Sequence, residues 1–331
     1  MKRKIAILGA GTWGTALAVM LSENNDVFVY SPIEIEINYI NTNHRHPNLK
    51  DAIIPTNISF LTSIKEVINN ADIVVFAAPS IFIRDTAKKA KEYINRNMII
   101  VTVAKGIELD TLFTMSEIIE DELGKGYKLV ALSGPTHAEE VSLGLPTTIV
   151  SASSDKEARN IIQEVFSSPY MRVYTNDDIY GVELCGALKN VLALASGISS
   201  GLGYGDNAKA AIITRGIAEM ARLGKALNCK EYTFFGLTGV GDLIVTATSI
   251  HSRNNKCGYL IGKGYSTLDA IKEVGMVVEG INALEAAKKL ADKVNVEMPL
   301  VNAVYQIVKE NKKPKDVINS LFARELKSEK K

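Results

Sequence analysis

The N-terminal half of the chain alternates short apolar runs with longer amphipathic segments. The apolar runs have the length and residue types of buried strands and lie at 4–8, 27–30, 58–60, 72–77, 98–103, 128–133, 146–150 and 170–174. Segments with helical spacing separate several of them, at 15–21, 81–94, 111–123 and 155–166. Strands that alternate with helices predict a mostly parallel sheet covered on both faces, which is a doubly wound α/β domain.

Beyond about residue 175 the pattern changes to helical segments with no strand-like run between them. These predicted helices are 178–197, 207–227, 240–249, 253–262, 267–274, 279–293, 300–310 and 314–321. The change of pattern predicts an α/β domain at 1–175 followed by an all-helical (all-α) domain at 176–331. The charged end of the chain, 327–331, is expected to fray.

The stretch 181–223 of the helical half reads as two helices joined by a glycine-rich turn at 199–206. Its first helix is apolar almost all the way round, which is typical of a buried helix, yet it contains Lys189 on the same face as Cys185 and Leu192. Burial of an ammonium group is costly, so a protein uses one to hold a partner charge or to lower the amine pKa for proton transfer. The alternative is a side chain whose stem lies along the core while its amine reaches water.

The first predicted strand ends in a glycine-rich turn that leads straight into a helix. Gly9, Gly11 and Gly14 have the G-x-G-x-x-G spacing, in which the first allows a tight turn and the second lets a pyrophosphate approach the backbone. The third lets helix and strand pack closely, and the helix N-terminus offers free N–H groups to phosphate. The pattern predicts a Rossmann-type dinucleotide-binding domain, and the alternative is a tight turn with no ligand.

The residues after the second predicted strand bear on the choice between NAD and NADP. NAD-selective domains usually carry an acidic residue there, which binds the ribose 2′-hydroxyl group. In this chain the position has Tyr30, Ser31 and Pro32, and the first acidic residue beyond them is Glu34. We therefore expect no acid that repels a 2′-phosphate and no arginine that binds one, which slightly favours NADP over NAD.

Ligands of open α/β sheets lie beyond the carboxyl ends of the strands, where turns of small residues follow predicted strands at 77–80, 104–106 and 133–136. Lys105 is the charged residue in these turns, and the alternative for it is an ordinary surface lysine. In the helical half, Asp242 opens a helix and is either a functional acid or a cap. Thr246, one turn further along, would lie on the same face of that helix as Asp242. Arg253 opens another helix, where its guanidinium group could bind a phosphate. The alternative is an ordinary exposed arginine.

Composition argues against several classes of function. The 331 residues are too many for one ordinary core, and the nearly balanced 38 basic and 37 acidic residues give no support to a role on nucleic acid or a membrane surface. We find no secretion signal and no apolar run long enough for a bilayer, so a cytoplasmic protein is expected. Cys185, Cys229 and Cys257 are expected to be reduced thiols, and His44 and His46 to form a solvated loop pair rather than a metal site.

A set of motifs occurs in order from Ile5 to about Leu321: GAGTWGTALA, AKGIE, SGPTHAEE, GVELCGALKN, ITRGIAEMARLG, GVGDLIVTATS, HSRNNKCG, VVEG and MPLVNAVYQI. With these motifs the chain resembles the NAD(P)-dependent glycerol-3-phosphate dehydrogenases, especially the bacterial biosynthetic type. The resemblance implies a Rossmann domain followed by an all-helical domain, with the active site between them, and a homodimer. It also implies reduction of dihydroxyacetone phosphate to sn-glycerol 3-phosphate, a precursor for phospholipid synthesis.

By position, the resemblance implies that Lys189 is the proton-transferring group. It implies a substrate pocket lined by Lys105, Gly134, Thr136, Lys189, Asp242, Ser252, Arg253 and Asn254, with Asn190 and Thr246 nearby. It implies cofactor contacts from Gly9, Gly11, Thr12, Trp13, Gly14, Lys105, Ala138, Arg253, Val277 and Glu279. No metal is expected, because the four histidines do not form a ligand set. His137 stands where many members have phenylalanine, and we expect it to pack rather than to act in catalysis.

Two other functions stay open at this stage. One is a related two-domain dehydrogenase of a hydroxyacid or a hydroxyacyl-CoA, whose carboxylate or CoA would need different anchors. The other is a non-catalytic dinucleotide-sensing protein, which would need the glycine-rich turn but not a buried lysine that faces a phosphate pocket.

Overall fold

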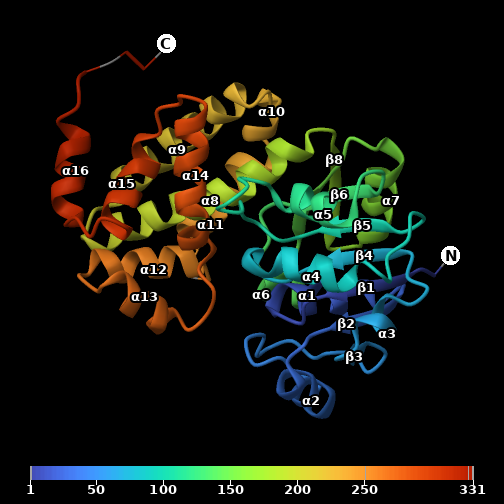
Figure 1. The fold of residues 1–331 in the computed structure, drawn as a ribbon. Coiled ribbons are helices and arrows are strands. Elements are labelled where there is room, and N and C mark those ends of the chain that lie inside the picture. The colour runs from blue at the N-terminus through green and yellow to red at the C-terminus, as the bar shows by residue number, and fades with distance from the viewer. Residues whose placement is uncertain (1, 250, 327, 330–331) are drawn as a thin grey trace.

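In the described part of the chain, an eight-stranded sheet occupies the N-terminal half (Figure 1). The computed structural model describes residues 2–249, 251–326 and 328–329. In sheet order the strands are β3 (Ser59–Leu61), β2 (Asp26–Tyr30), β1 (Lys4–Leu8), β4 (Ile73–Phe76), β5 (Ile99–Thr102), β6 (Lys128–Ser133), β7 (Thr147–Ala152) and β8 (Met171–Asn176). Neighbouring strands are parallel except β6 and β7, which are antiparallel. The mostly parallel sheet is therefore confirmed.

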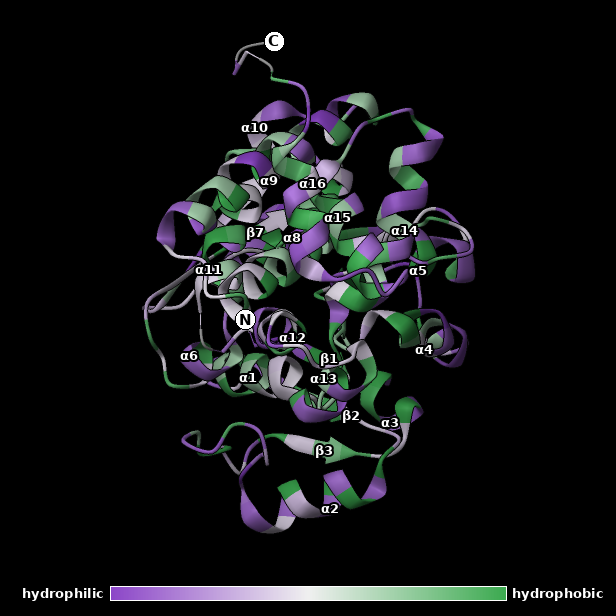
Figure 2. Cartoon of the chain, turned by 90° about the vertical axis from the view of Figure 1, so that its left-hand side faces the viewer, coloured by the Kyte–Doolittle hydropathy of each residue, from purple (hydrophilic) through white to green (hydrophobic). Residues whose placement is uncertain are grey.

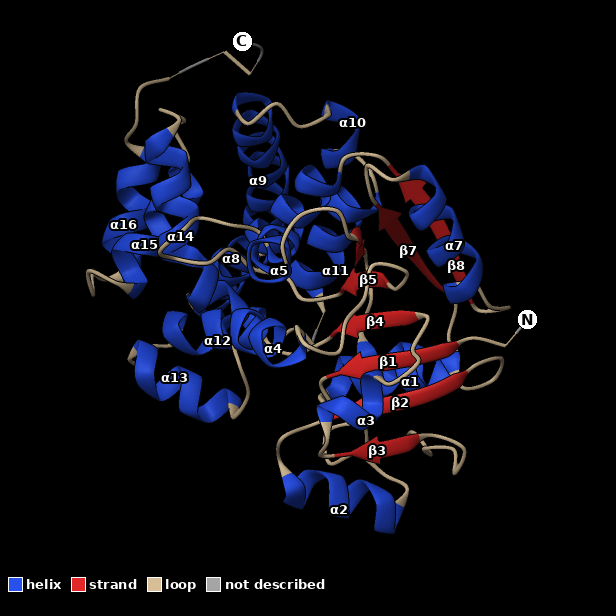
Figure 3. Ribbon diagram, turned by 45° about the vertical axis from the view of Figure 1, so that its right-hand side comes forward, coloured by secondary structure: helices blue, strands red, loops and turns tan. Residues whose placement is uncertain are grey.

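Helices cover both faces of this sheet (Figure 3). They are α1 (Thr12–Leu21), α2 (Glu34–Asn43), α3 (Ile64–Ile68), the 3-10 turn η1 (Ser80–Phe82), α4 (Ile83–Ala90), α5 (Met115–Leu123), α6 (Ala138–Ser142) and α7 (Lys156–Phe166). Successive residues of a strand point to opposite faces. Ile5 and Ile7 of β1 thus share a core with α1, α6 and α7, whereas Ala6 and Leu8 share one with α3, α4 and α5. The α/β half is doubly wound, as predicted.

Some helices of this half differ from the predicted segments. α1 begins at Thr12, and the predicted helix 81–94 is divided between η1 and α4. α5 begins later than predicted because Thr114 and Glu117 form a capping box at its start. The apolar pattern did not predict α2, α3 or α6, since short or largely exposed helices carry few buried positions; α2 buries Ile37 and Ile40 alone among its described residues.

The C-terminal half is helical and lies beside the sheet (Figure 1). Its elements are α8 (Ile179–Gly201), α9 (Asp206–Ala226), α10 (Glu231–Phe234), the π-helical turn η2 (Leu237–Gly241), α11 (Asp242–Thr248), α12 (Arg253–Gly262), α13 (Thr267–Val274), α14 (Glu279–Lys293), α15 (Pro299–Val308) and α16 (Pro314–Phe322). α12, α13 and α14 have the predicted bounds, whereas α10 and η2 were not predicted. The domain boundary at 175/176 stays a prediction, and most of the tail 327–331 lies outside the described residues.

Helix α8 forms the core of the helical half, where α9, α11, α12, α14 and α15 pack around it. In Figure 2 apolar residues, drawn in green, gather around α8 where the helices of this half meet. The expectation that no apolar run is long enough for a bilayer is wrong, because α8 has 23 residues and sufficient hydropathy. However, 94% of its most apolar window is buried inside the protein, as in the core helix of a globular fold.

Glycines allow the backbones of α8 and α12 to touch. A Cβ atom on Gly258 would lie 2.2 Å from the carbonyl oxygen of Leu194, and one on Gly197 would lie 2.1 Å from that of Asn255. The glycine seam, as we call this contact, consists of Gly197, Gly201, Gly258 and Gly262. Because no side chain separates the two helices, the seam fixes the start of α12 relative to the middle of α8.

Candidate active site

A cleft of about 740 Å³ lies between the turns that follow the strands and the helical half. The predicted site residues that line it are Gly11, Thr12, Trp13, Lys105, Thr136, Ala138, Lys189, Ser252, Arg253, Asn254, Val277 and Glu279, joined by Asn190, Thr246 and His137. Four predicted residues are not among the described lining residues: Gly9, Gly14, Gly134 and Asp242. The structure therefore brings residues from both halves of the chain to one place.

The glycine-rich turn between β1 and α1 has the close packing that a dinucleotide site requires. A Cβ atom on Gly9 would lie 2.7 Å from the backbone of Ala77, and one on Gly14 would lie 2.1 Å from the carbonyl oxygen of Gly9. A Cβ atom on Gly11 would meet nothing within 4 Å, so this residue faces open space in the cleft. Among the described residues no side chain caps α1, which leaves N–H groups for a phosphate. The turn fits the pyrophosphate of a dinucleotide.

Lys189 is buried in the middle of α8, with 6% of the residue exposed. Its Nζ donates to the carboxylate of Asp242 and, at 2.8 Å, to Oγ1 of Thr246. Asp242 is the first residue of α11, follows the π-helical turn η2 and is 1% exposed. The amine is therefore held inside the protein, and the reading in which it reaches water is wrong.

A second lysine binds the same carboxylate. Nζ of Lys105 lies 2.7 Å from Oδ2 of Asp242 and donates to the carbonyl oxygen of Gly134 at 3.2 Å. Thr136 donates its hydroxyl to the same carbonyl oxygen at 3.2 Å. Lys105 follows β5 and Gly134 follows β6, so Asp242 links the ends of two strands to Lys189 of α8. Lys105 is consequently not an ordinary surface lysine.

Burial lowers the pKa of Lys189 to about 7, because an ammonium group at this position has lost most of its hydration. The negative charge of Asp242 raises the pKa, and the positive charge of Lys105 lowers it. An amine that titrates near neutral pH can both give and accept a proton there. A perturbed pKa of this kind in a cleft is characteristic of proton-transfer groups.

The start of α12 provides a cationic end to the cleft. Ser252 caps the helix by accepting a hydrogen bond from the backbone N–H of Asn255 at 3.2 Å. Arg253, the first residue of the helix, is exposed and lines the cleft. Asn254 donates to Oδ1 of Asn190 at 2.9 Å and accepts from the backbone N–H of Gly280 at 2.8 Å. These bonds join α12 to α8, beside Lys189, and to α14.

A hydrogen-bonded contact between the two halves was not predicted. The carboxylate of Glu279, at the start of α14, accepts from the hydroxyl of Ser80 and, at 3.0 Å, from its backbone N–H. The sequence carried part of the signal, because 77–80 was recognised as a turn beyond a strand. Glu279 was expected as a cofactor contact, but nothing in the sequence indicated that it would bind this turn, 199 residues away.

The end of β2 differs from the expectation in two ways. Glu36, in the first turn of α2, lines the cleft, so the prediction that no acid stands near this position is wrong. Its carboxylate accepts from the hydroxyl of Ser31 at 2.7 Å, which brings it back to the strand end. His46 also lines the cleft and is 3% exposed, so the expected solvated pair with His44 is wrong as well. His44 is the left-handed C-cap of α2.

His137 lines the cleft next to Ala138, and its ring centroid lies 5.7 Å from that of His251. Its Nε2 is buried without a hydrogen-bond partner among the described residues. Burial and, to a lesser degree, the charge of Lys189 lower its pKa. The contact with His251 is consistent with the packing role expected for it, and its neutral ring adds no cation to the cleft.

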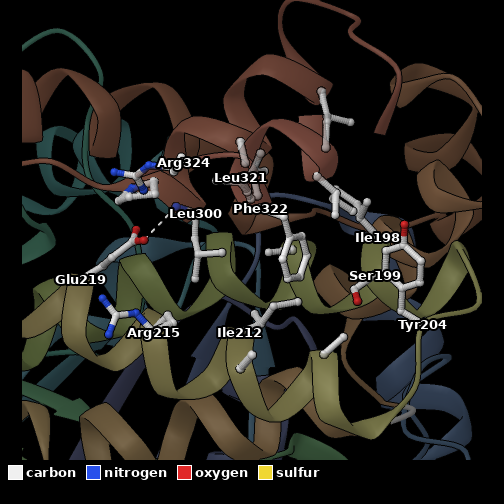
Figure 4. A pocket seen from close by; sticks show the side chains of 18 of the residues that line it. Ile198, Ser199, Tyr204, Ile212, Arg215, Glu219, Leu300, Leu321, Phe322 and Arg324 are labelled. Carbon is white, nitrogen blue, oxygen red and sulfur yellow. Dashed lines mark hydrogen bonds between the residues drawn. The ribbon is translucent and has the colours of Figure 1, made fainter. Parts of the chain in front are cut away.

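The described residues contain no group of three or more His, Cys, Asp or Glu side chains that could hold a metal ion. A second cavity, of about 460 Å³, lies among α8, α9, α15 and α16 (Figure 4). It has apolar walls that include Ile212 and Phe322, and at one end Glu219 accepts from the backbone N–H of Leu300 at 2.8 Å. No predicted site residue is among the described residues that line it.

Comparison with known proteins agrees with this geometry. The family model of the NAD-dependent glycerol-3-phosphate dehydrogenase N-terminus matches residues 4–159, and that of the C-terminus matches residues 178–319. A glycerol-3-phosphate dehydrogenase [NAD(P)+] of Lactobacillus delbrueckii subsp. bulgaricus is 56% identical, with 98% of each chain covered. One from Listeria monocytogenes is 46% identical, covering 99% of this chain and 98% of its own.

A solved structure gives the same result for the fold. The crystal structure of glycerol-3-phosphate dehydrogenase from Coxiella burnetii has a TM-score of 0.94 and 34% sequence identity, covering 98% of this chain and 99% of its own. The similarity thus spans both halves of the molecule and the cleft between them. The chain belongs to the NAD-dependent glycerol-3-phosphate dehydrogenase family.

Proposed function

We propose that the protein is an sn-glycerol-3-phosphate dehydrogenase, which reduces dihydroxyacetone phosphate reversibly with NADH or NADPH. The observation that carries the proposal is Lys189, a buried amine with a pKa of about 7 in the cleft that also contains the glycine-rich turn. The relatives' names state both NAD and NADP as cofactors. The product, sn-glycerol 3-phosphate, is a building block for phospholipids.

A nicotinamide dinucleotide, when bound along the glycine-rich turn, supplies the hydride for the C2 carbonyl of the substrate. The protein's own part is to manage charge and the proton. As negative charge develops on the carbonyl oxygen, the ammonium of Lys189 stabilises it and donates a proton from Nζ. Asp242 holds that ammonium in place, and Lys105 adds a second positive charge beside it. In the reverse direction neutral Lys189 accepts the proton of the hydroxyl group.

The substrate phosphate is held at the start of α12. Arg253 offers a fork of N–H donors, and the free backbone N–H groups of the helix N-terminus add to them. Asn254 is fixed by its bonds to Asn190 and Gly280 and therefore keeps this end of the cleft at a set position relative to Lys189. Holding the phosphate and the carbonyl oxygen at once orients the substrate for reaction.

The test is a steady-state assay of dihydroxyacetone phosphate reduction with NADH and with NADPH, followed at the nicotinamide absorbance band. The same assay with a hydroxyacid series and a hydroxyacyl-CoA tests the alternative dehydrogenases. Turnover of dihydroxyacetone phosphate well above that of the other compounds supports the proposal. Turnover of another compound alone, or dinucleotide binding without any turnover, refutes it.

The resemblance also implies a homodimer in the cytoplasm, and both remain predictions. Size-exclusion chromatography with light scattering distinguishes a mass near 36.0 kDa, for one chain, from twice that value. Fractionation of cells that express the protein tests its location.

A further inference from the structure

An acidic side chain stands where a dinucleotide would place its adenosine ribose. The backbone N–H of Gly9 donates to the carbonyl oxygen of Tyr30 at 2.9 Å, so the glycine-rich turn and the end of β2 are adjacent. Just beyond, the hydroxyl of Ser31 accepts from the N–H of Ile33 at 3.2 Å and donates to Oε2 of Glu36 at 2.7 Å. The carboxylate is therefore fixed at the strand end, at the position used for ribose recognition in this fold.

A hydrogen-bond donor accompanies this acceptor. Nδ1 of His46 accepts from the backbone N–H of Asn48 at 3.1 Å, which assigns the hydrogen of the neutral ring to Nε2. That Nε2 is buried and lies 3.9 Å from Oε1 of Glu36; it makes no hydrogen bond of normal geometry to a described residue, although the backbone of Ala10 lies close enough to raise the pKa of the ring. A buried N–H donor beside an ordered carboxylate acceptor matches the two neighbouring hydroxyl groups of a ribose.

The positive charges among the described lining residues belong to other elements of the cleft. Lys105 and Lys189 bind Asp242, and Arg253 stands at the start of α12. Lys256, which also lines the cleft, donates to the backbone of Glu273 at 3.3 Å.

Near the end of β2 the described lining residues are Ile33, Glu36, His46 and Asn48, none of them a permanent cation. Burial lowers the pKa of His46, against the smaller raising effects of Glu36 and of the Ala10 backbone, and so favours the neutral ring. A 2′-phosphate would meet a carboxylate here, with no cation among these lining residues to compensate it.

We propose that Glu36, held by Ser31 and faced by His46, binds the adenosine ribose hydroxyls and makes this protein select NAD(H) over NADP(H). The proposal rests on the dinucleotide-binding part of the proposed function and reverses the slight preference for NADP inferred from the sequence. Glu36 escapes the usual sequence pattern because it lies in the following helix rather than at the strand terminus.

The test is the direct binding of NADH and NADPH to the full-length protein, measured by quenching of tryptophan fluorescence. Trp13, the single tryptophan of the sequence, lines the cleft and reports on bound dinucleotide. We expect NADH to bind about tenfold or more tightly than NADPH, because opposing like charges carry a penalty of this size. Glu36→Gln, which keeps the size and an acceptor for Ser31, should reduce this ratio by about tenfold, mainly through tighter binding of NADPH.

Glu34→Gln is the matched control, since Glu34 is an exposed acid in the same first turn of α2 that does not line the cleft. It should leave the ratio of the two affinities unchanged. Equal or tighter binding of NADPH by the unmodified protein overturns the proposal. So does a ratio that Glu36→Gln leaves unchanged, or that Glu34→Gln changes equally.

Binding needs no turnover, which separates this proposal from the proposed reaction. Selective binding of NADH together with failure to reduce dihydroxyacetone phosphate leaves the assignment of Glu36 intact and refutes the dehydrogenase activity. Conversely, if the protein binds NADPH as tightly as NADH and reduces dihydroxyacetone phosphate with it, the assignment of Glu36 is refuted and the dehydrogenase activity is supported. If neither dinucleotide binds, the assignment of Glu36 is wrong.

Discussion

Replacement of Asp242 by asparagine tests how the charge around Lys189 sets its proton affinity. The carboxylate accepts from Lys189 through Oδ1 and lies 2.7 Å from Nζ of Lys105 through Oδ2. Asparagine has nearly the same shape but no charge. Because Asp242 raises the pKa of Lys189, its neutralisation should lower that pKa below the value of about 7.

The size of the effect follows from the separation of the charges. Two opposite unit charges about 4 Å apart attract by about 4 kcal/mol at an effective dielectric constant near 20, equivalent to about 3 pKa units. Opposite charges in proteins shift a pKa by about 1–3 units, so we expect a pKa of about 4–6 in the variant. At pH 7 the ammonium fraction then falls from about one half to between about 0.1 and 0.001, and kcat/KM for reduction falls about 5- to 500-fold.

The assay is kcat/KM for dihydroxyacetone phosphate reduction as a function of pH. Lys189 must carry its proton to donate it, so kcat/KM should fall as the pH rises through the pKa, and the fall should begin at lower pH in the Asp242→Asn variant. The substrate phosphate titrates near pH 6, about equally for both proteins, so the difference between the two profiles reports on Lys189. Asp206→Asn, which neutralises a fully exposed acid of the helical half, should leave the profile unchanged.

Loss of one partner of a buried ion pair destabilises a protein by about 3–5 kcal/mol, so thermal unfolding must first show that Asp242→Asn is folded. A folded variant whose profile coincides with that of the unmodified protein, or moves to higher pH, refutes the reasoning.

Lys189→Ala should lower kcat by about 10²–10⁴-fold, as for loss of a general acid, while NADH still quenches Trp13; near-normal kcat would remove the amine from the mechanism. Arg253→Ala should raise KM for dihydroxyacetone phosphate by about 10–100-fold, the value of charged hydrogen bonds; a loss confined to kcat would contradict an anchoring role. In urea titrations, Gly258→Ala should lower the free energy of unfolding by about 1–3 kcal/mol, because the added Cβ atom would overlap a carbonyl oxygen. The control is Gly205→Ala, where an added Cβ atom meets nothing within 4 Å, and it should lower the free energy of unfolding by less than about 1 kcal/mol. Equal losses of stability in the two variants would argue against close packing at the glycine seam.

Those parts of the fold that depend on short-range patterns could be predicted from the sequence. The alternation of apolar strands with helices predicted the doubly wound sheet, and the spacing of Gly9, Gly11 and Gly14 predicted the phosphate-binding turn. Lys189 stood out because charge is expensive in an apolar helix, a rule that needs no knowledge of tertiary contacts.

Parts that depend on how separate elements meet could not be predicted. The shared carboxylate of Asp242 depends on η2, a π-helical turn with no clear sequence signal, which sets the start of α11. The carboxylate of Glu36 comes back to the end of β2 because the chain turns after the strand, where Ser31 binds both Ile33 and Glu36. His46 is buried although its polar surroundings in sequence indicated an exposed loop. The antiparallel pairing of β7 with β6 likewise reflects the path of the connection between them and not the composition of the strand.

The direct backbone contact of α8 with α12 has a consequence for any opening of the cleft. Helices separated by long side chains can slide as rotamers change, whereas two backbones in contact have no such freedom. The proton donor and the phosphate anchor must then travel together, as one piece, relative to the nucleotide-binding sheet. Opening the cleft would admit or release substrate without altering the spacing that decides whether its carbonyl oxygen meets the amine.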